Sequence, residues 1–118
     1  MVTQVVFETH STSVDNETGV ASGWRHSALS AVGREHAARL GQRRRDDGLS
    51  VVFVSDLRRA SETAAIAFDG SPVPVLADWR LRECNYGDRN GMATVDLHRD
   101  RRWHLDERYP GVRAGVRR

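Results

Sequence analysis

The alternation of short β-branched runs with helical patterns is the feature that most restricts the fold of this chain. Polar or turn-forming residues bound three predicted strands, at Val2–Phe7, Val51–Val54 and Pro74–Ala77. Helical patterns over residues 30–45 and 55–69 separate them. Strands and helices in this order predict right-handed crossovers and a parallel sheet with helices on its faces.

The first helix has a clear start, a buried face and an end. Ser30 can cap it, and Val32, Ala37 and Leu40 are spaced to form its apolar face. The charged positions predicted to face solvent are Arg34, Glu35, Arg39 and Arg43. A turn at Asp46, Asp47 and Gly48 ends the helix.

The second helix has small residues along one face. We expect it to begin at Ser55 and Asp56, and to end before Gly70 and Pro72. Its apolar positions are Ala60, Ala64, Ala65 and Ile66.

Elsewhere the pattern predicts a long loop from Ser11 to Ser27, a turn-rich segment from Cys84 to Gly91, and a helix from Ala93 to about Arg102.

The histidine at the end of the first predicted strand is the first candidate for chemistry. His10 follows an apolar run and precedes a series of hydroxyl and amide side chains. The carboxyl ends of strands in open α/β sheets are where such folds bind ligands, and a neutral imidazole there can act as nucleophile or base. A strand-end histidine taken alone is more often a hydrogen-bonded structural residue, so this position needs support from other motifs.

Composition places the chain in a broad class. Its 118 residues predict one soluble domain spanning 1–118, and no apolar run is long enough to cross a bilayer. All 18 cationic side chains are arginine against 16 carboxylates, for a net charge of +2. Arginine suits phosphate ligands, although coding bias explains the composition more simply. Nucleic-acid binding is not expected, because charge is nearly balanced and no stacking-aromatic pattern accompanies it.

The cysteine count and the amino-terminal residues bear on location. The single Cys84 excludes an internal disulfide and fits a reducing compartment. The first residues lack a basic segment and a long apolar stretch, so a signal peptide is not expected. We therefore predict a cytoplasmic protein. The histidines are scattered and no ligand spacing recurs, so neither a metal nor another cofactor is predicted.

Three separated segments carry recognisable motifs. The first includes a histidine, an asparagine and a Gly-Trp pair, the second a Ser-Asp-Leu-Arg-Arg-Ala run, and the third an Arg-Glu-Cys-Asn-Tyr-Gly run. Their residues are His10, Asn16, Gly23, Trp24, Leu29 and Gly33; Ser55–Ala60, Thr63 and Ala64; and Leu81–Gly87, Asn90 and Gly91. In order and type, these segments resemble the histidine phosphatase superfamily, whose fold is phosphoglycerate mutase-like. The resemblance implies a three-layer α/β/α fold with a parallel-type sheet.

The resemblance also implies a role for each matched residue. His10 would accept a phosphoryl group as the nucleophile, and Glu83 would donate a proton to the leaving group. The implied phosphate-binding residues are Arg59, Asn16, Ser13 and Ser11. The partner would be a small phosphorylated molecule. Apart from its motif, Arg59 could simply pair with Asp56 or Glu62, and Glu83 could be an ordinary loop carboxylate.

Two departures from the family pattern matter. Thr9-His10-Ser11 stands where the family has Arg-His-Gly, so one phosphate-binding guanidinium is replaced. Losing one such donor costs roughly 100- to 1,000-fold in rate, which predicts a weak or specialised catalyst. The alternative is an inactive relic or a phospho-ligand-binding module of the same fold.

The second departure lies at the carboxyl end. Tyr109-Pro110-Gly111 resembles the start of a family segment, but the chain then runs through a basic tail to Arg118. We expect the fold to be incomplete there, without the family's second active-site histidine, and neither His98 nor His104 matches that role. A missing strand would expose a sheet edge, so a homodimer across that edge is predicted.

Overall fold

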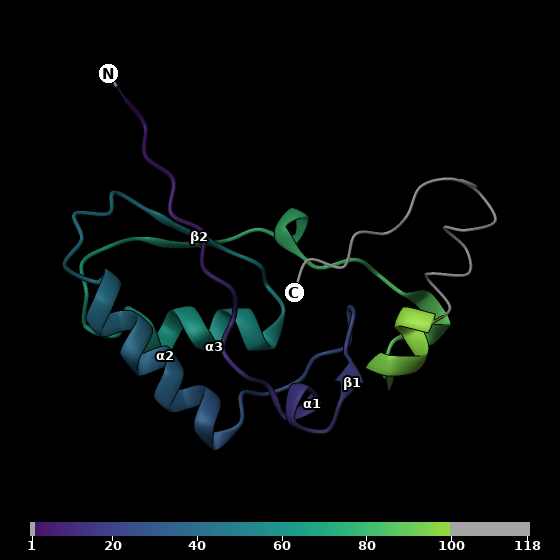
Figure 1. Cartoon of the computed structure of the whole chain (residues 1–118). Coiled ribbons are helices and arrows are strands. Elements are labelled where there is room, and N and C mark those ends of the chain that lie inside the picture. Colours follow the sequence, from purple (N-terminus) through teal and green to yellow (C-terminus); the bar gives the residue numbers. More distant parts are fainter. Residues whose placement is uncertain (1, 100–118) are drawn as a thin grey trace.

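The computed structural model describes residues 2–99, and its largest parallel element is a pair of strands joined by a helix. Strands β2 (Val52–Val54) and β3 (Val75–Ala77) pair in parallel, with Val52 opposite Val75. Helix α3 (Arg58–Ala67) connects them (Figure 1). This is the predicted strand–helix–strand unit, so both strands, their parallel pairing and the α/β class are confirmed.

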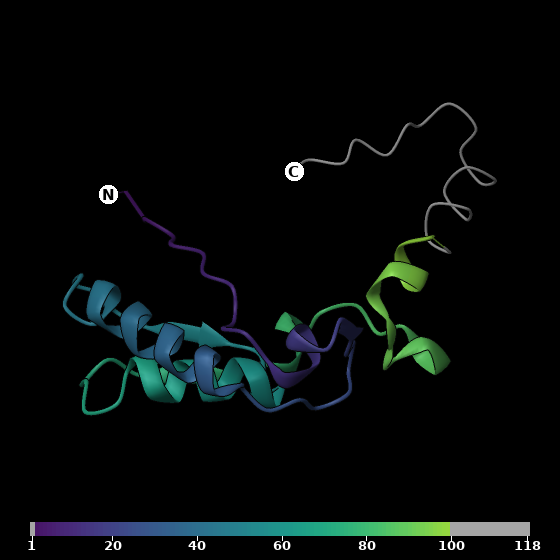
Figure 2. The same ribbon diagram turned by 60° about the horizontal axis from the view of Figure 1, so that its bottom comes forward.

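Helix α2 (Ala31–Arg44) packs against α3, and both lie on the same side of the β2–β3 pair (Figure 2). Ala37 and Leu40 on α2 and Ala67 on α3 are buried in this contact. Ser30 caps α2 as predicted, because its side chain accepts a hydrogen bond from the backbone N–H of Gly33. The prediction for Val32 was wrong: its side chain is 47% exposed, because no described element covers that side of the first turn.

The start of α3 differs from the prediction. Leu57 is the N-cap residue and makes no side-chain capping bond. Asp56 instead binds the guanidinium of Arg82, which lies far along the chain. A long-range charge-assisted pair has therefore replaced the local cap that Ser55 and Asp56 were expected to supply.

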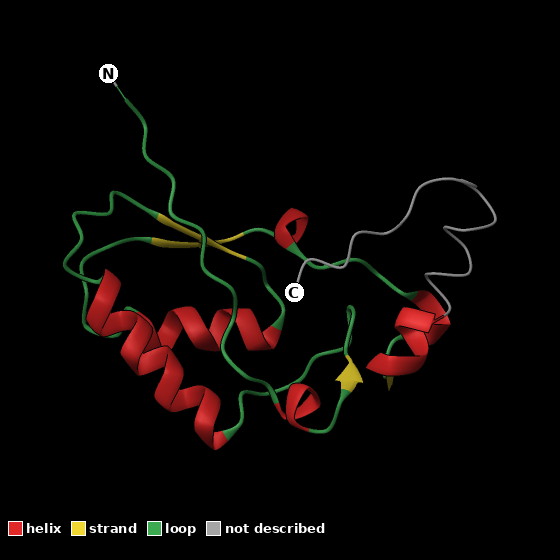
Figure 3. Ribbon diagram, in the orientation of Figure 1, coloured by secondary structure: helices red, strands yellow, loops and turns green. Residues whose placement is uncertain are grey.

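The predicted first strand, Val2–Phe7, is the main correction to the fold. Residues 2–10 make no β-bridge, and Figure 3 draws the segment as loop. Val5 is 84% exposed and Phe7 is 86% exposed. A β-branched run becomes a strand only where a neighbour supplies ladder partners, and no strand within residues 2–99 pairs with this one.

The chain becomes anchored immediately after this segment. The carbonyl oxygen of Thr12 accepts a 3.0 Å hydrogen bond from the backbone N–H of Ser30, and Ser13 forms a β-bridge with Leu29. Gly33 permits this close approach, because a Cβ there would lie 1.9 Å from the Thr12 oxygen. The start of α2 therefore fixes the position of residues 11–13, just after His10.

The expected loop of residues 11–27 contains secondary structure. A short helix α1 (Val14–Glu17) is followed by β1 (Val20–Ala21), which pairs antiparallel with β4 (Met92–Ala93). This two-residue ladder has no periodic signature in the sequence. It brings the segment after residue 90 back against the loop that follows His10.

The turn-rich segment is confirmed around two 3₁₀ turns, η1 (Trp79–Leu81) and η2 (Gly87–Arg89). Helical residues 94–99 follow β4, in agreement with the first part of the helix predicted from Ala93; its remainder lies outside the described residues, as do His104 and the Tyr109–Gly111 segment. Among residues 2–99, no helix combines the length and apolar character that a membrane span needs.

Candidate active site

A small cavity of about 130 Å³ gathers most of the predicted site residues. It is lined by His10, Asn16, Val20, Ala21, Ser22, Arg59, Glu83, Tyr86, Thr94, Leu97 and His98. Four of the six predicted site residues, His10, Asn16, Arg59 and Glu83, therefore meet at one place, although they come from all three motif segments.

Hydrogen bonding defines which nitrogen of His10 is available. Its Nδ1 lies 2.7 Å from the carbonyl oxygen of Ser11. A carbonyl can only accept, so Nδ1 carries the proton and donates it. The lone pair of the neutral ring is then on Nε2, which is the form that a nucleophilic imidazole needs.

Arg59 is the best-anchored cation of the site. Only 3% of its side-chain surface is exposed. Its guanidinium donates to the carbonyl oxygens of Gly23 at 2.8 Å and Arg25 at 3.1 Å, and to the carboxylate of Glu83 at 3.1 Å. The guanidinium is thus pre-positioned at the cavity by fixed backbone acceptors.

The alternative ion pairs for Arg59 are excluded. Asp56 binds Arg82, and Glu62 pairs with Arg58 and Arg34. Arg59, in the first turn of α3, is directed to the cavity instead of along the helix surface.

Glu83 receives two donors. Its carboxylate accepts the 3.1 Å bond from Arg59 and a 2.7 Å bond from the hydroxyl of Tyr86. Tyr86 also lines the cavity. The carboxylate is therefore held in place at the cavity that His10 also lines.

The loop that carries Glu83 is held by further contacts of Trp24 and Arg82. The indole Nε1–H of Trp24 donates to the carbonyl oxygen of Glu83 at 2.7 Å. The guanidinium carbon of Arg82 lies 4.8 Å from the centre of the Trp24 ring, a cation–π contact. Arg82 also makes two 2.6 Å bonds to Asp56, which lower the pKa of that carboxyl.

The structure separates the remaining predicted phosphate-binding residues from the cavity. Ser13 is fully buried, and its hydroxyl accepts from the backbone N–H of Asn16 as the cap of α1. Asn16 Oδ1 in turn accepts from Ser13, so the Asn16 amide NH₂ is the group left for a ligand. Ser11 is buried, and its backbone N–H donates to Thr63 Oγ1 at 3.0 Å.

A buried carboxylate holds the loop that forms one wall of the cavity. Asp15 accepts from the hydroxyl of Ser22 at 2.6 Å and from Arg25 at 2.8 Å. Burial raises the pKa of Asp15, but the hydrogen bonds from Ser22 and Arg25 and the charge of Arg25 outweigh it, so the pKa lies below 3.8. An ionised Asp15 therefore fixes the Ser22–Arg25 segment.

Sequence analysis assigned no role at the site to four residues that shape it: Trp24, Arg82, Tyr86 and His98. The contacts of Trp24 with Glu83 and of Arg82 with Asp56 join distant segments, and no local pattern predicts them. Tyr86 lies three residues after Glu83, within the motif that the sequence analysis quoted. His98 had one usable signal: Thr94, Leu97 and His98 share a face of the predicted helix. The structure places that face on the cavity, so a second imidazole lies near His10.

Comparison with known proteins agrees with this arrangement. The model of the histidine phosphatase superfamily (branch 1) matches residues 6–114. The chain belongs to this superfamily. Phosphoglycerate mutase 1 of Saccharomyces cerevisiae is 37% identical over 98 residues, which cover 79% of this chain and 40% of that protein.

Solved structures of the superfamily match the fold. Bacillus stearothermophilus YhfR aligns with a TM-score of 0.73 and 32% identity, covering 85% of this chain and 50% of that one. A mycobacterial glucosyl-3-phosphoglycerate phosphatase aligns with a TM-score of 0.68 and 27% identity, covering 87% of this chain and 47% of that one. The phosphoglycerate mutase-like fold is therefore confirmed, in a chain that spans about half the length or less of these relatives.

Within residues 2–99, no three His, Cys, Asp or Glu side chains come together in a group able to hold a metal ion.

Proposed function

We propose that this chain catalyses phosphomonoester hydrolysis or phosphoryl transfer through a phosphohistidine on His10. The observation that carries the proposal is the meeting of three groups at one cavity: the imidazole of His10, the buried guanidinium of Arg59 and the carboxyl of Glu83. Nucleophile, phosphate holder and proton donor are the parts that this chemistry requires.

The reaction has two balanced steps. His10 Nε2 forms a bond to phosphorus while the ester P–O bond breaks, and the departing oxygen takes a proton from the protonated carboxyl of Glu83. The oxygen of water or of an acceptor hydroxyl then attacks phosphorus, the P–N bond breaks, and the Glu83 carboxylate takes the proton that the attacking oxygen loses. Arg59 and the Asn16 amide would bind the phosphoryl oxygens throughout, where charge builds up.

The residue before His10 sets an expected limit on the rate. Thr9 supplies a neutral hydroxyl where the family motif has arginine, and it lines a different cavity from the one that holds Arg59 and Glu83. Its hydroxyl cannot replace the missing charge. We therefore expect turnover roughly 100- to 1,000-fold below that of an enzyme with both guanidinium groups.

A phospho-ligand-binding module is the second candidate function. Glu83 and two carbonyl oxygens use three of the five N–H donors of Arg59, so two remain to hold a phosphate whether or not His10 reacts. In that case the ligand would remain a small phosphorylated molecule, and no phosphohistidine would form.

Hydrolysis of an aryl phosphate by the purified protein distinguishes the two functions. The wild-type chain is compared with His10→Ala and Arg59→Ala, with folding checked by circular dichroism. Turnover that is lost in His10→Ala supports the enzyme. Turnover that is equal in wild type and His10→Ala would reject it, and phosphate affinity that falls only in Arg59→Ala would favour the binding module.

Self-association is a separate part of the proposal. Phe53 and Leu76 face each other across β2 and β3 with 63% and 51% of their surfaces exposed, and Phe7 is also exposed. A second copy that pairs across the exposed edge of this sheet would supply ladder partners and help to remove these side chains from water. Light scattering at micromolar concentration should give the mass of a dimer; a monodisperse monomer would contradict it.

We also propose a reducing, cytoplasmic setting, on the basis of the free Cys84.

A further inference from the structure

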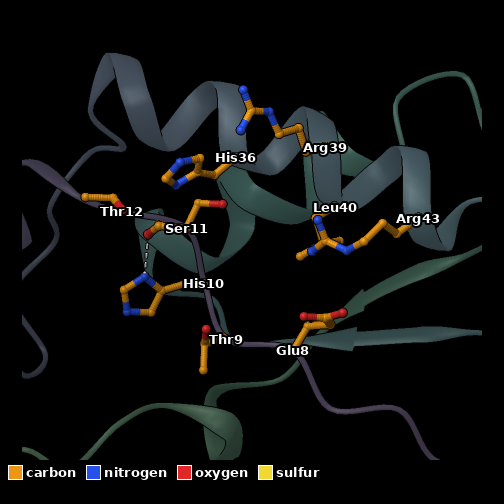
Figure 4. Close-up of a pocket in the computed structure, with 9 residues that line it drawn as sticks. All are labelled: Glu8, Thr9, His10, Ser11, Thr12, His36, Arg39, Leu40 and Arg43. Atoms are coloured by element: carbon orange, nitrogen blue, oxygen red, sulfur yellow. Dashed lines mark hydrogen bonds between the residues drawn. The ribbon is translucent and has the colours of Figure 1, made fainter.

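A second cavity, larger than the candidate active site, lies beside it between residues 8–12 and α2. Its volume is about 390 Å³. Figure 4 shows the extended segment with Thr9, Ser11 and Thr12 on one side, and the side chains of α2 on the other. His10 lines both cavities, and none of the other residues of the first site lines this one.

The α2 wall of the larger cavity is cationic. His36, Arg39 and Arg43 recur at helical spacing and therefore share one face, together with the buried Leu40. Arg39 and Arg43 have no carboxylate partner among residues 2–99. By contrast, the other two arginines of α2 are paired: Arg34 with Glu62, and Arg44 with Glu8 and Asp47.

Among the described residues that line the larger cavity, the only acidic one is Glu8. Glu8 binds Arg44 at 2.9 Å, and Arg44 does not line the cavity. The guanidinium groups of Arg39 and Arg43 are therefore left without a carboxylate partner on this wall. Arg43 also stabilises α2, because the carboxyl end of a helix favours cations, whereas Arg39 precedes the last turn, where this effect has faded.

The opposite wall supplies neutral donors. Thr9, Ser11 and Thr12, which carry hydroxyl groups, line the cavity from this segment. Of the three, Ser11 is buried. Paired guanidinium groups facing hydroxyls form the donor set that suits a phosphate, because a guanidinium can donate two parallel bonds to its oxygens.

We propose that this cavity is a second anion site, which binds a phosphate group through Arg39 and Arg43. It is separate from the Arg59 cavity and holds phosphate whether or not His10 is phosphorylated. Inorganic phosphate and the phosphate of a small organic monoester have the same recognised chemistry, so the experiment includes both.

Titration followed by the Nε–Hε signals of labelled arginine tests the site directly. Inorganic phosphate and phenyl phosphate are added separately at constant ionic strength, with chloride as the reference anion. We expect the Arg39 and Arg43 signals to shift and saturate in Arg59→Ala as they do in wild type. Saturation with inorganic phosphate alone would identify the free anion as ligand, and saturation with both would include monoesters.

Matched variants complete the test. The double variant Arg39→Ala/Arg43→Ala should weaken phosphate binding at this cavity at least tenfold, as followed by the backbone amide signals of residues 8–12. Lysine at both positions keeps the charge but loses the planar fork, so its affinity should be intermediate. Arg34→Ala, on the same helix, should bind like wild type. Equal shifts with chloride, or unchanged affinity in the double alanine variant, would overturn the proposal.

Discussion

The indole Nε1–H of Trp24 donates a 2.7 Å hydrogen bond to the main-chain carbonyl oxygen of Glu83. Because this bond positions the loop that carries the proposed proton donor, Trp24→Phe should reduce turnover while leaving the ring contact with Arg82 largely intact. A hydrogen bond is worth about 1 kcal/mol, which corresponds to about a fivefold loss in aryl phosphate hydrolysis.

Trp79→Phe is the matched control for this change. The Trp79 side chain is 62% exposed and does not line the active-site cavity, so turnover should stay at the wild-type level. An equal loss in both variants would show that the Trp24 bond does not position Glu83.

Gly23 should tolerate no side chain. Its φ is +57°, and a Cβ would lie 1.9 Å from Oδ1 of Asn90, an atom that accepts a hydrogen bond from the backbone N–H of Tyr86. Backbone strain and the displaced bond together should destabilise Gly23→Ala by about 2 kcal/mol. Urea unfolding measures this change.

Gly48→Ala separates the two contributions. Gly48 has a similar φ of +73°, but nothing lies within 4 Å of its added Cβ. Its loss should therefore be limited to the backbone term of about 1 kcal/mol. If both alanine variants lost the same free energy of unfolding, the close approach of Asn90 would have no energetic role.

Asp15 should make stability depend on acidity. Its folded-state pKa lies below 3.8, so its ionised form contributes stability that is fully present above pH 4 and lost as pH falls through the lowered pKa. Asp15→Asn should cost about 1–3 kcal/mol at pH 7, with the difference from wild type shrinking below pH 4. Denaturant unfolding across pH measures both effects. Asp88→Asn, at an exposed position, should change stability by less than about 0.5 kcal/mol.

The sequence predicted elements whose signals are local. The Ser30 cap and the β-branched Val52–Val54 run each depend on neighbouring residues, and the structure contains both. The predicted apolar face of α3 was partly wrong: Ala64 is buried, but Ala65 is exposed. The Val2–Phe7 run had an equally strong local pattern, yet it forms no strand, because strand formation also requires a partner.

In the candidate site, the motif residues could be predicted from the sequence, whereas the long-range contacts that hold them could not. The family resemblance predicted one site for His10, Arg59 and Glu83, and all three residues line one cavity in the structure. The Trp24–Glu83 and Arg82–Asp56 contacts join residues 59 and 26 positions apart. Contacts over such separations leave no local pattern in the sequence. The contacts that hold the Glu83 loop therefore could not be predicted without the structure.

His98 provides the last prediction. Its imidazole lines the Arg59 cavity, so it can donate a hydrogen bond to a bound phosphate there. One charge-assisted bond is worth about 1.5–3 kcal/mol, and His98→Ala should weaken inorganic phosphate binding at this cavity by about tenfold or more. Calorimetric titration in the Arg39→Ala/Arg43→Ala background isolates this cavity. Val95→Ala, on the exposed side of the same helical turn, should leave the affinity unchanged; a loss shared by both variants would point to unfolding of the helix instead of a lost donor.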